Sequence, residues 1–479
     1  METRQLDYET AMMTREAFFY AYKTVAGETE RHLLLESGRS GKLCIAGINP
    51  LVTLQASEGS LEATWRDGTV ESRAGEDPLE SIESFLGTFG ISGSLPELPE
   101  FQGGAIGFIS YDYVRRYEAL PSVAINDLET PDLHFYLFDQ WAVLDMETEQ
   151  VYFMALPDRG ICPMQMKEKW LEAAAKGLEA RKFGMQEKAV PTAVPEEIRV
   201  SVDAKQFERM VVEVQQYIEL GDVEQVNLSV RQSAPLHADP LDMYEALRAI
   251  NPSPYMASIG SPDFAVVSGS PELLLKKRGD VVSTRPIGGT RPRGKDEAED
   301  RALEAELLSN TKETKEHKML VDVELDDFSR ICAEETVETD EFMVIEKYSH
   351  VMHLVSNLRG VVRQDQTNSD VIRGVFPGGS ITGAPKVRTM ELIEELEPTR
   401  RGLYTGSIGW IGFNGDLDLN IVIRTAYIKG GEVFIQAGAG LVSDSIPKAE
   451  YIESLNKANA LWQAKEMAEA DRVKKAMLL

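Results

Sequence analysis

The sequence predicts an α+β protein in which strands and helices follow one another without a regular rhythm. Short β-type runs dominate before residue 183, whereas strands and helices interleave after residue 200. This order lacks the repeated strand–helix–strand unit of a doubly wound parallel sheet. No G-x-G-x-x-G follows a predicted strand and no G-x-x-x-x-G-K-[S/T] occurs, so neither nicotinamide nor ATP binding has motif support.

The composition excludes several classes of protein. The 479 residues include 50 Lys and Arg against 78 Asp and Glu, a formal charge of −28 that disfavours binding to nucleic acid. No apolar run approaches the roughly 20 residues of a membrane span, and the N-terminus lacks a secretory pattern. The three cysteines are too far apart to indicate a disulfide framework or a metal-binding pair. We expect a cytoplasmic globular protein that acts on neither nucleic acid nor membranes.

The chain divides at a proline-containing segment. Residues 1–182 form the first region, with predicted strands at Lys42–Ile48, Ala105–Ser110, His134–Phe138 and Gln150–Ala155 and a helix at Gln165–Arg181. In 183–200, two prolines, small residues and charges interrupt helical periodicity, which is typical of a linker. Residues 201–479 form the second region.

The second region begins with a helix over Ala204–Leu220, for which Asp203 is the expected N-cap. Further strands are predicted at Glu224–Gln232, Tyr255–Ile259, Phe264–Ser268 and Val281–Thr284. Further helices are predicted at Asp296–Asn310, Pro385–Glu395 and Lys448–Ala468. Ser407–Phe413, Leu419–Ile428 and Glu432–Ala437 have the pattern of adjacent antiparallel strands with short turns.

Two pairs of glutamates, Glu313 with Glu316 and Glu450 with Glu453, are each spaced three residues apart in helical contexts. Residues i and i+3 share a helix face, so each pair directs two carboxylates to one side. Four carboxylates from two helices suit a hard divalent cation, and we expect Mg²⁺, with His317 as a possible neighbour. The alternative is two solvated acidic faces, since charged side chains mostly lie outside.

The segment FPGGSITGAPK leads into a predicted helix and has the features of an anion site. Gly378, Gly379 and Gly383 let a ligand approach the backbone, and Pro385 suits the first helical position. Unpaired N–H groups at the helix start, together with the charge of Lys386, would bind a carboxylate or phosphate. A structural loop-to-helix junction is the alternative.

Three further residues have competing interpretations. Arg424 lies in an apolar predicted strand and needs an anionic partner, which is either a ligand or a buried carboxylate of the protein. Lys457 shares a helix face with Glu450 and Glu453, although it could form only an exposed ion pair. His353 lies in an apolar run, which by pattern alone is typical of a core histidine.

Four segments occur in this order: RPIGGTRPRG (285–294), KEHKMLVDVELDD (315–327), FPGGSITGAPKVRTMELIEELEP (376–398) and QAGAGLVSDSIPKAEYIESLNKA (436–458). Together they resemble the recurring motifs of the chorismate-utilising enzymes. LLLESGRSGKLCIAG and FQGGAIGFISYDY resemble the N-terminal half of the ammonia-using members, so the resemblance extends from about Leu33 to Leu461. It implies large antiparallel β-sheets packed as a sandwich with helices outside.

The resemblance also implies which nucleophile is used. In the family that the chain resembles, members that add water carry a lysine at the position of Gln225, where it can act as a general base. Glutamine cannot deprotonate water, and ammonia needs no base because it is already nucleophilic. Gln225 therefore implies amination of chorismate. Since no glutaminase domain is recognisable in the chain, ammonia would come from a separate glutaminase subunit, a glutamine amidotransferase.

The family's functional positions can be carried over to this sequence. Mg²⁺ on the four glutamates would bind the ring carboxylate of chorismate, and Lys457 would lie close to the bound acid groups. The enolpyruvyl carboxylate would contact Tyr404, Arg424 and the backbone of Gly438, Ala439 and Gly440, with Thr382, Gly383 and Lys386 as further substrate-binding residues. Glu272 corresponds to the general acid that protonates the departing C4 hydroxyl, and His353 and Thr290 correspond to residues that line the ring.

Two products stay open. GGSITGAPK and RRGLYTGSIGW resemble the branch that makes 4-amino-4-deoxychorismate for 4-aminobenzoate and folate, which we favour; anthranilate, for tryptophan biosynthesis, is the alternative. Gly288 stands where many aminodeoxychorismate synthases carry a lysine that forms a covalent adduct with the ring. Its absence implies that ammonia attacks more than once or that another group substitutes. VELDD at 323–327 departs from the usual LxRND.

A second ligand site is implied in the N-terminal half. Two segments resemble the tryptophan pocket of the anthranilate branch. They are Leu35, Glu36 and Ser37, and Asn251, Pro252, Ser253, Pro254, Tyr255 and Met256. A catalytically reduced homologue that binds an amino acid here is the alternative to an enzyme. The sequence leaves open whether tryptophan binds.

Overall fold

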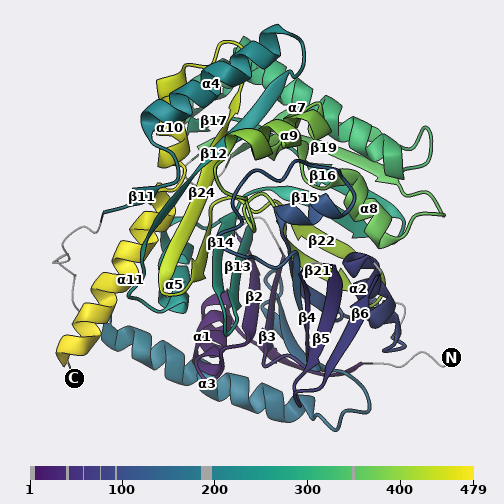
Figure 1. Cartoon of the computed structure of the whole chain (residues 1–479). Coiled ribbons are helices and arrows are strands. Elements are labelled where there is room, and N and C mark those ends of the chain that lie inside the picture. Colours follow the sequence, from purple (N-terminus) through teal and green to yellow (C-terminus); the bar gives the residue numbers. More distant parts are fainter. Residues whose placement is uncertain are drawn as a thin grey trace.

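Strands from both halves of the chain form two large antiparallel sheets (Figure 1). The computed structural model describes residues 6–38, 42–57, 59–75, 77–91, 94–184, 197–347 and 351–478. The central part of the predicted linker, residues 185–196, lies outside these ranges. Within them, each sheet contains 12 strands.

The first sheet runs from an N-terminal edge to a C-terminal edge. Its order is β1 (Asp7–Met12), β10 (Gln150–Ala155), β9 (Gln140–Asp145), β3 (Leu43–Ile48), β2 (His32–Ser37), β13 (Tyr255–Gly260), β14 (Ala265–Ser270), β23 (Thr425–Lys429), β24 (Glu432–Leu441), β12 (Gln225–Pro235) and β11 (Arg199–Val200). The short β20 (Gly383–Ala384) also pairs with β12.

The second sheet also combines strands from both halves of the chain, and its order runs from the C-terminal strands to the N-terminal ones. Its order is β17 (Ile287–Pro292), β19 (Val351–Val361), β16 (Val281–Arg285), β15 (Leu273–Arg278), β22 (Leu417–Asn420), β21 (Ser407–Gly412), β7 (Gly104–Ile109), β8 (Leu133–Leu137), β4 (Val52–Ser57), β5 (Ser60–Trp65) and β6 (Val70–Ala74). The strand β18 (Glu338–Lys347) pairs with β19.

The two halves of the chain are joined within both sheets. Strand β2 pairs with β13 from His32↔Gly260 to Ser37↔Tyr255, and β7 pairs with β21 from Ile109↔Ser407 to Gly104↔Gly412. Main-chain hydrogen bonds therefore continue across the boundary between residues 1–182 and 201–479.

A single apolar layer lies between the sheets. Ile45 and Val266 of the first sheet and Leu54 and Phe108 of the second are at most 3% exposed and belong to the same core cluster. A sheet that buries one apolar face has to pack it against another layer, and burying each large apolar side chain stabilises the fold by roughly 1.5–3 kcal/mol. The predicted α+β sandwich is confirmed.

Helices lie on the outside of the two sheets (Figure 1). They are α1 (Arg15–Ala26), α2 (Pro78–Gly87), α3 (Pro163–Gly184), α4 (Ala204–Glu219), α5 (Pro240–Ile250), α6 (Glu297–Ser309), α7 (Thr311–Ile331), α8 (Asn368–Val375), α9 (Lys386–Leu396), α10 (Pro447–Asn456) and α11 (Asn459–Leu478), with 3₁₀ turns η1 (Tyr111–Arg116) and η2 (Gly379–Ile381). Asp203 caps α4 as predicted and forms a capping box with Gln206. None of the helices in the described ranges is long and apolar enough to cross a membrane.

Three predicted elements are wrong in detail. The single helix over Lys448–Ala468 is two helices, because α10 packs on β24 and α4 whereas α11 packs on α5. The strand over Leu419–Ile428 is also divided, because the chain leaves the second sheet after Asn420 and enters the first at Thr425. Pro385 is the N-cap of α9 and not its first residue.

A buried ion pair connects three of these elements. Arg401, after α9, donates to the Glu397 carboxylate from Nη2 at 2.7 Å and from Nε at 3.0 Å, and both side chains are at most 3% exposed. The same guanidinium donates to the carbonyls of Ile381 (2.8 Å) and Asn227 (2.7 Å). Glu397 also accepts from the N–H and Oγ of Ser229. The pair thus fixes the C-terminal end of α9 to η2 and β12.

We expect Arg401→Met to lower the free energy of unfolding by about 3–5 kcal/mol, because it leaves the Glu397 carboxylate buried without its counter-charge. Urea denaturation of the purified chain measures this. Arg301→Met is the matched control, since Arg301 forms an exposed i,i+4 pair with Glu297 and should contribute little. Equal effects of the two substitutions would contradict a structural role for the buried pair.

Candidate functional site

A cavity of about 500 Å³ lies where β12, β24, β17, β19, α7, α10 and η2 converge. Its lining includes most of the sequence-predicted site residues, namely Gln225, Glu272, Thr290, Glu313, Glu316, His353, Tyr404, Arg424, Gly438, Gly440, Glu450, Glu453 and Lys457. They come from segments up to 232 residues (457 − 225) apart in the chain, so the fold brings together side chains that the sequence separates.

Four predicted substrate-binding residues do not line this cavity. The Lys386 ammonium pairs with Asp327 at 2.5 Å and also donates to the Val375 carbonyl, so its charge is satisfied within the protein. Thr382 Oγ1 donates to the Gly378 carbonyl, and Gly383 pairs with β12. Ala439 alternates with Gly438 and Gly440 and therefore faces the opposite side of β24. The start of α9 is a structural junction in this chain.

Glu272 lies between β14 and β15 and is 6% exposed. Burial raises the pKa of its carboxyl to about 7, although the Ser380 hydroxyl, a backbone hydrogen bond from Ile287 and the charges of Arg424 and Lys457 oppose this rise. Ser380 Oγ donates to Glu272 Oε1 at 2.9 Å. A carboxyl group with a pKa near neutrality can donate a proton under physiological conditions.

Arg424 lies at the point where the chain crosses between the sheets. Its φ of 49° is uncommon for a residue with a side chain. Such a backbone conformation costs free energy and persists only where the surrounding structure holds it in place. Burial lowers the pKa of its guanidinium, and Glu272 partly offsets this. No ion pair of Arg424 is found in the described part of the chain, so its charge is available to an anionic ligand in the cavity.

The four glutamates all line the cavity. Burial and the charges of Glu313 and Glu453 raise the pKa of Glu316, and burial and Glu453 raise that of Glu450. Arg291 contacts Glu313 at 3.0 Å and Lys457 contacts Glu453 at 2.9 Å, while Lys457 also donates to the Gly438 carbonyl.

These carboxylates do not form a closed metal cage within the described part of the chain. Among the described residues, no three His, Cys, Asp or Glu side chains are close enough to form a complete metal site. Mg²⁺ commonly uses only one or two protein carboxylates and keeps water or substrate oxygens as its other ligands. His317 is fully buried and is not among the lining residues of the cavity, and its Nε2 lies 2.7 Å from Ser356 Oγ.

His353 and Thr290 form a neutral hydrogen-bonded pair in the cavity wall. They are directly opposite on β19 and β17, with 2.9 Å between His353 Nδ1 and Thr290 Oγ1. Burial and the nearby Arg424 lower the pKa of His353 to about 4, so the imidazole is uncharged at neutral pH. The apolar pattern around His353 is that of a strand, but its ring lines the cavity.

Among the cavity residues that were not predicted from the sequence, two contribute polar groups close to predicted site residues. Asn227 lies two residues after Gln225 on β12 and shares its face, and Ser380 on η2 contacts Glu272. The period of two along β12 could have identified Asn227. Ser380 had no local signal, because only the tertiary fold brings η2 to Glu272.

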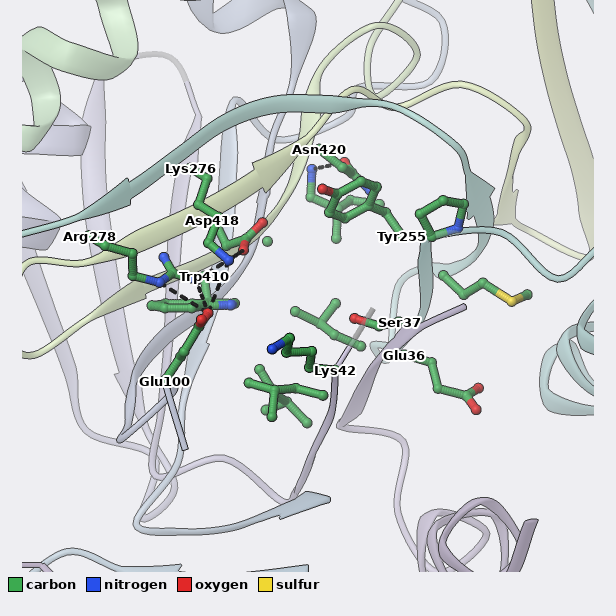
Figure 2. Close-up of a pocket in the computed structure, with 17 residues that line it drawn as sticks. Glu36, Ser37, Lys42, Glu100, Tyr255, Lys276, Arg278, Trp410, Asp418 and Asn420 are labelled. Carbon is green, nitrogen blue, oxygen red and sulfur yellow. Dashed lines mark hydrogen bonds and ion pairs between the residues drawn. The ribbon is translucent and has the colours of Figure 1, made fainter. Parts of the chain in front are cut away.

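A second cavity, of about 290 Å³, lies beside the junction of the two halves (Figure 2). Six of the nine predicted amino-acid-pocket residues line it, namely Leu35, Glu36, Ser37, Pro254, Tyr255 and Met256, whereas Asn251, Pro252 and Ser253 do not. Opposite them, the Arg278 guanidinium lies 4.7 Å from the Trp410 ring centroid and pairs with Glu100.

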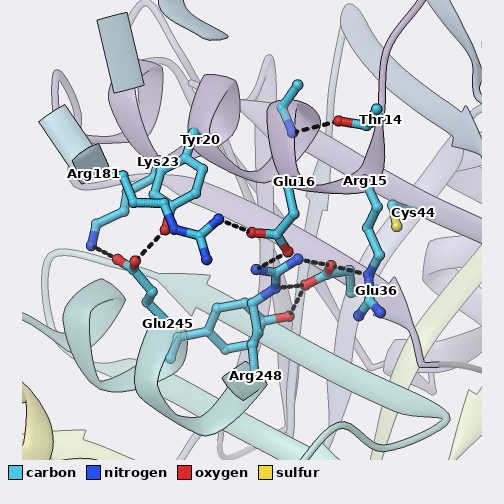
Figure 3. A network of polar contacts seen from close by, with 12 residues as sticks. Thr14, Arg15, Glu16, Tyr20, Lys23, Glu36, Cys44, Arg181, Glu245 and Arg248 are labelled. Atoms are coloured by element: carbon cyan, nitrogen blue, oxygen red, sulfur yellow. Dashed lines mark hydrogen bonds and ion pairs between the residues drawn. The ribbon is translucent and has the colours of Figure 1, made fainter. Parts of the chain in front are cut away.

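The carboxylate of Glu36 is already bound within the protein (Figure 3). It accepts from Arg15, from both Nε and Nη2 of Arg248, and from the hydroxyl of Tyr244. Burial alone would raise its pKa, but Arg248 and Arg15 hold the pKa below its ordinary value. Glu36 therefore links α1 and α5 to β2 rather than offering a free charge to the second cavity.

Known proteins share this sequence and fold. The chain is 46% identical over 463 residues to aminodeoxychorismate synthase component 1 of Bacillus subtilis, covering 95% of this chain and 96% of that protein. It is 41% identical over 453 residues to anthranilate synthase component 1 of Thermus thermophilus, covering 94% and 95% respectively.

Solved structures agree with this relationship. Anthranilate synthase component I of Streptococcus pneumoniae superposes with a TM-score of 0.74 at 33% identity, covering 89% of this chain and 93% of that one. A menaquinone-specific isochorismate synthase of Escherichia coli shares the fold, with a TM-score of 0.69 at 16% identity and coverage of 96% and 95%. Residues 30–463 match the profile of chorismate binding enzymes, and the chain therefore belongs to that family.

Proposed function

We propose that this protein aminates chorismate with ammonia to 4-amino-4-deoxychorismate, for 4-aminobenzoate and folate biosynthesis. The observation that carries the proposal is the pairing of Glu272 and Gln225 in one cavity. Glu272 is a buried carboxyl group with a pKa of about 7, and Gln225 has no group that can deprotonate water. This combination supplies a proton to a leaving group and suits a nucleophile that needs no base.

The chemical step follows from these two roles. The lone pair of one ammonia forms a C–N bond at C2, the ring double bonds shift, and the C4–O bond breaks with its electrons moving to oxygen. The Glu272 carboxyl proton goes to that oxygen, which leaves as water. A second ammonia then forms the C4–N bond while the double bonds shift back and the C2–N bond breaks, so that the first nitrogen leaves as ammonia. The new C4 ammonium group loses one proton to the Glu272 carboxylate, which restores the acid.

Chorismate is a dianion, so a protein of charge −28 needs local positive charge to bind it. Arg424 and Lys457 supply part of this charge, and Tyr404 and the backbone of Gly438 lie beside them in the cavity wall. Glu313, Glu316, Glu450 and Glu453 would hold Mg²⁺, which when bound supplies positive charge to the ring carboxylate.

The identity of the product rests on similarity, whereas position 288 departs from the favoured branch. The relative that makes aminodeoxychorismate is 46% identical, against 41% for the anthranilate synthase of Thermus thermophilus. A Cβ on Gly288 would lie 2.5 Å from His317 Nδ1, so a lysine there would require His317 to move. Ammonia then acts without an enzyme–ring adduct. Anthranilate synthesis remains the second candidate, because Gly288 provides no lysine that would distinguish the favoured branch.

The ammonia source is a separate subunit. Both relatives are named as component 1 of their enzymes, which supports a second component that supplies ammonia. The alternative of a catalytically reduced amino-acid-binding homologue is disfavoured, because the acid, the cations and the carboxylates expected of an active enzyme all line one cavity.

Product analysis tests the proposal directly. We expect the purified chain with chorismate, Mg²⁺ and ammonium, followed by excess aminodeoxychorismate lyase, to yield 4-aminobenzoate. Glutamine should replace ammonium only after a glutaminase subunit is added. Formation of anthranilate would establish the second candidate instead, and failure to consume chorismate would exclude both.

The role of Glu272 predicts a pH dependence. At a fixed concentration of free NH₃, we expect kcat to fall as the pH rises through about 7, because the carboxyl group loses the proton it donates. Glu272→Gln should lower kcat by about 10²–10⁴-fold and abolish this limb of the profile. An unchanged limb in the Glu272→Gln enzyme would assign the titration to another group.

The role of the carboxylates predicts a change in Mg²⁺ dependence. Glu450→Gln removes a negative ligand from the cavity, so the Mg²⁺ concentration for half-maximal activity should rise by at least about tenfold. Glu466→Gln is the control, because Glu466 is exposed on α11 away from the cavity lining. If both variants respond to Mg²⁺ like the wild type, α10 presents only a solvated acidic face.

A further inference from the structure

Two amide side chains in the wall of the main cavity have oxygens without a hydrogen-bond donor. Gln225 and Asn227 are two residues apart on β12, so their side chains lie on the same face of the strand. Both line the cavity and are 2% and 8% exposed. Within the described ranges, neither Gln225 Oε1 nor Asn227 Oδ1 has a partner. Buried carbonyl oxygens are normally satisfied, so this pair requires an explanation.

The neighbouring strand makes room for both amides. On β24, Gly440 is directly opposite Asn227, and Gly438 is opposite Ser229. A Cβ on Gly440 would lie 2.2 Å from Gln225 Nε2, and one on Gly438 would lie 2.8 Å from Asn227 Oδ1. Side chains at these two glycines would therefore displace the amides from the cavity wall.

The position of Asn227 is fixed by its surroundings. Its Nδ2 donates to the Ser380 carbonyl at 3.4 Å, which leaves Oδ1 as the free end of the amide. Its main-chain N–H donates to the Thr382 carbonyl at 2.9 Å, and its carbonyl accepts from the buried Arg401 at 2.7 Å. Ser380 in turn donates its hydroxyl to Glu272. One residue therefore connects Asn227 to the proposed proton donor.

We propose that Gln225 and Asn227 bind the incoming ammonia, with each amide oxygen accepting one N–H. The inference rests on the proposed function, because it assigns the site for the nucleophile of that reaction. Ammonia has three N–H donors and one lone pair, so two acceptors can hold it and leave the lone pair free to attack. A water molecule bound in the same way uses both of its protons, and neither amide can remove one to make it a nucleophile.

The binding role can be measured separately from the chemistry. Gln225→Met and Asn227→Leu preserve approximate side-chain volume but remove the acceptor oxygens. We expect each to raise the KM for ammonium at least about threefold, as the loss of one neutral hydrogen bond implies, while the KM for chorismate stays unchanged. Initial rates over a matrix of ammonium and chorismate concentrations at constant pH give both constants.

Ser380→Ala is the matched control. It removes the hydroxyl that contacts Glu272 but keeps the carbonyl that Asn227 contacts. We expect a lower kcat and a shifted pH profile with an unchanged KM for ammonium. A rise in ammonium KM equal to that of Asn227→Leu would assign the effect to Glu272 and overturn the inference.

The outcomes distinguish this inference from the proposed function. If the wild type does not aminate chorismate, the proposed function is wrong. If the wild type does so and both amide variants keep its ammonium KM, the amides are structural and only the ammonia site is wrong. Thermal melting identifies a misfolded variant, and if Asn227→Leu is misfolded, Gln225→Met alone decides, since it leaves the contacts of Asn227 intact.

Discussion

The buried pair of Arg401 and Glu397 is the interaction on which the geometry of the main cavity depends. Arg401 binds the carbonyls of Asn227 and Ile381, and Glu397 binds Ser229. These contacts hold β12 against η2. Gln225 and Asn227 project from β12, and Ser380 on η2 contacts Glu272. The relative positions of the proposed nucleophile site and proton donor therefore follow from an ion pair that touches neither substrate.

The charge distribution shows how an acidic chain can accommodate a dianion. Arg424, Lys457 and Lys312 line the cavity together with the four glutamates. Lys457 is held by the Gly438 carbonyl and by Glu453, whereas Arg424 has no ion pair among the described residues. The strained backbone at Arg424 is thus associated with a charge that the protein itself does not neutralise.

Local sequence patterns predicted those features that depend only on neighbouring residues, namely helix faces and helix caps. The i,i+3 spacing of Glu313 with Glu316 follows from helix geometry, and the capping of α4 by Asp203 follows from the residue type. The sandwich and the proposed roles of Glu272 and Gln225 needed the resemblance to known motifs. That resemblance placed Lys386 near the substrate, but its actual partner, Asp327, could not be identified from spacing because it lies 59 residues away on α7.

The same limit explains the errors around residues 420–425 and 457. An apolar run that crosses from one sheet to another has the same composition as one continuous strand, because both ends are buried. The break between α10 and α11 is likewise set by what each helix packs on, and neither glycine nor proline marks it. Such boundaries depend on contacts between distant segments, which a single sequence does not contain.

The pairing of β7 with β21 has a consequence for synthesis on the ribosome. Strand β7 ends at Ile109, and its partner does not begin until Ser407, so 298 residues (407 − 109) must be translated before the pair can form. At about 5–20 residues per second, this interval lasts about 15–60 s. During that time the nascent N-terminal half carries an unsatisfied strand edge at β7, which is a template for association with other chains, whereas β2 can pair as soon as β13 is translated. Productive folding of this enzyme in a crowded cell therefore depends on shielding the edge of β7 until the last third of the polypeptide emerges.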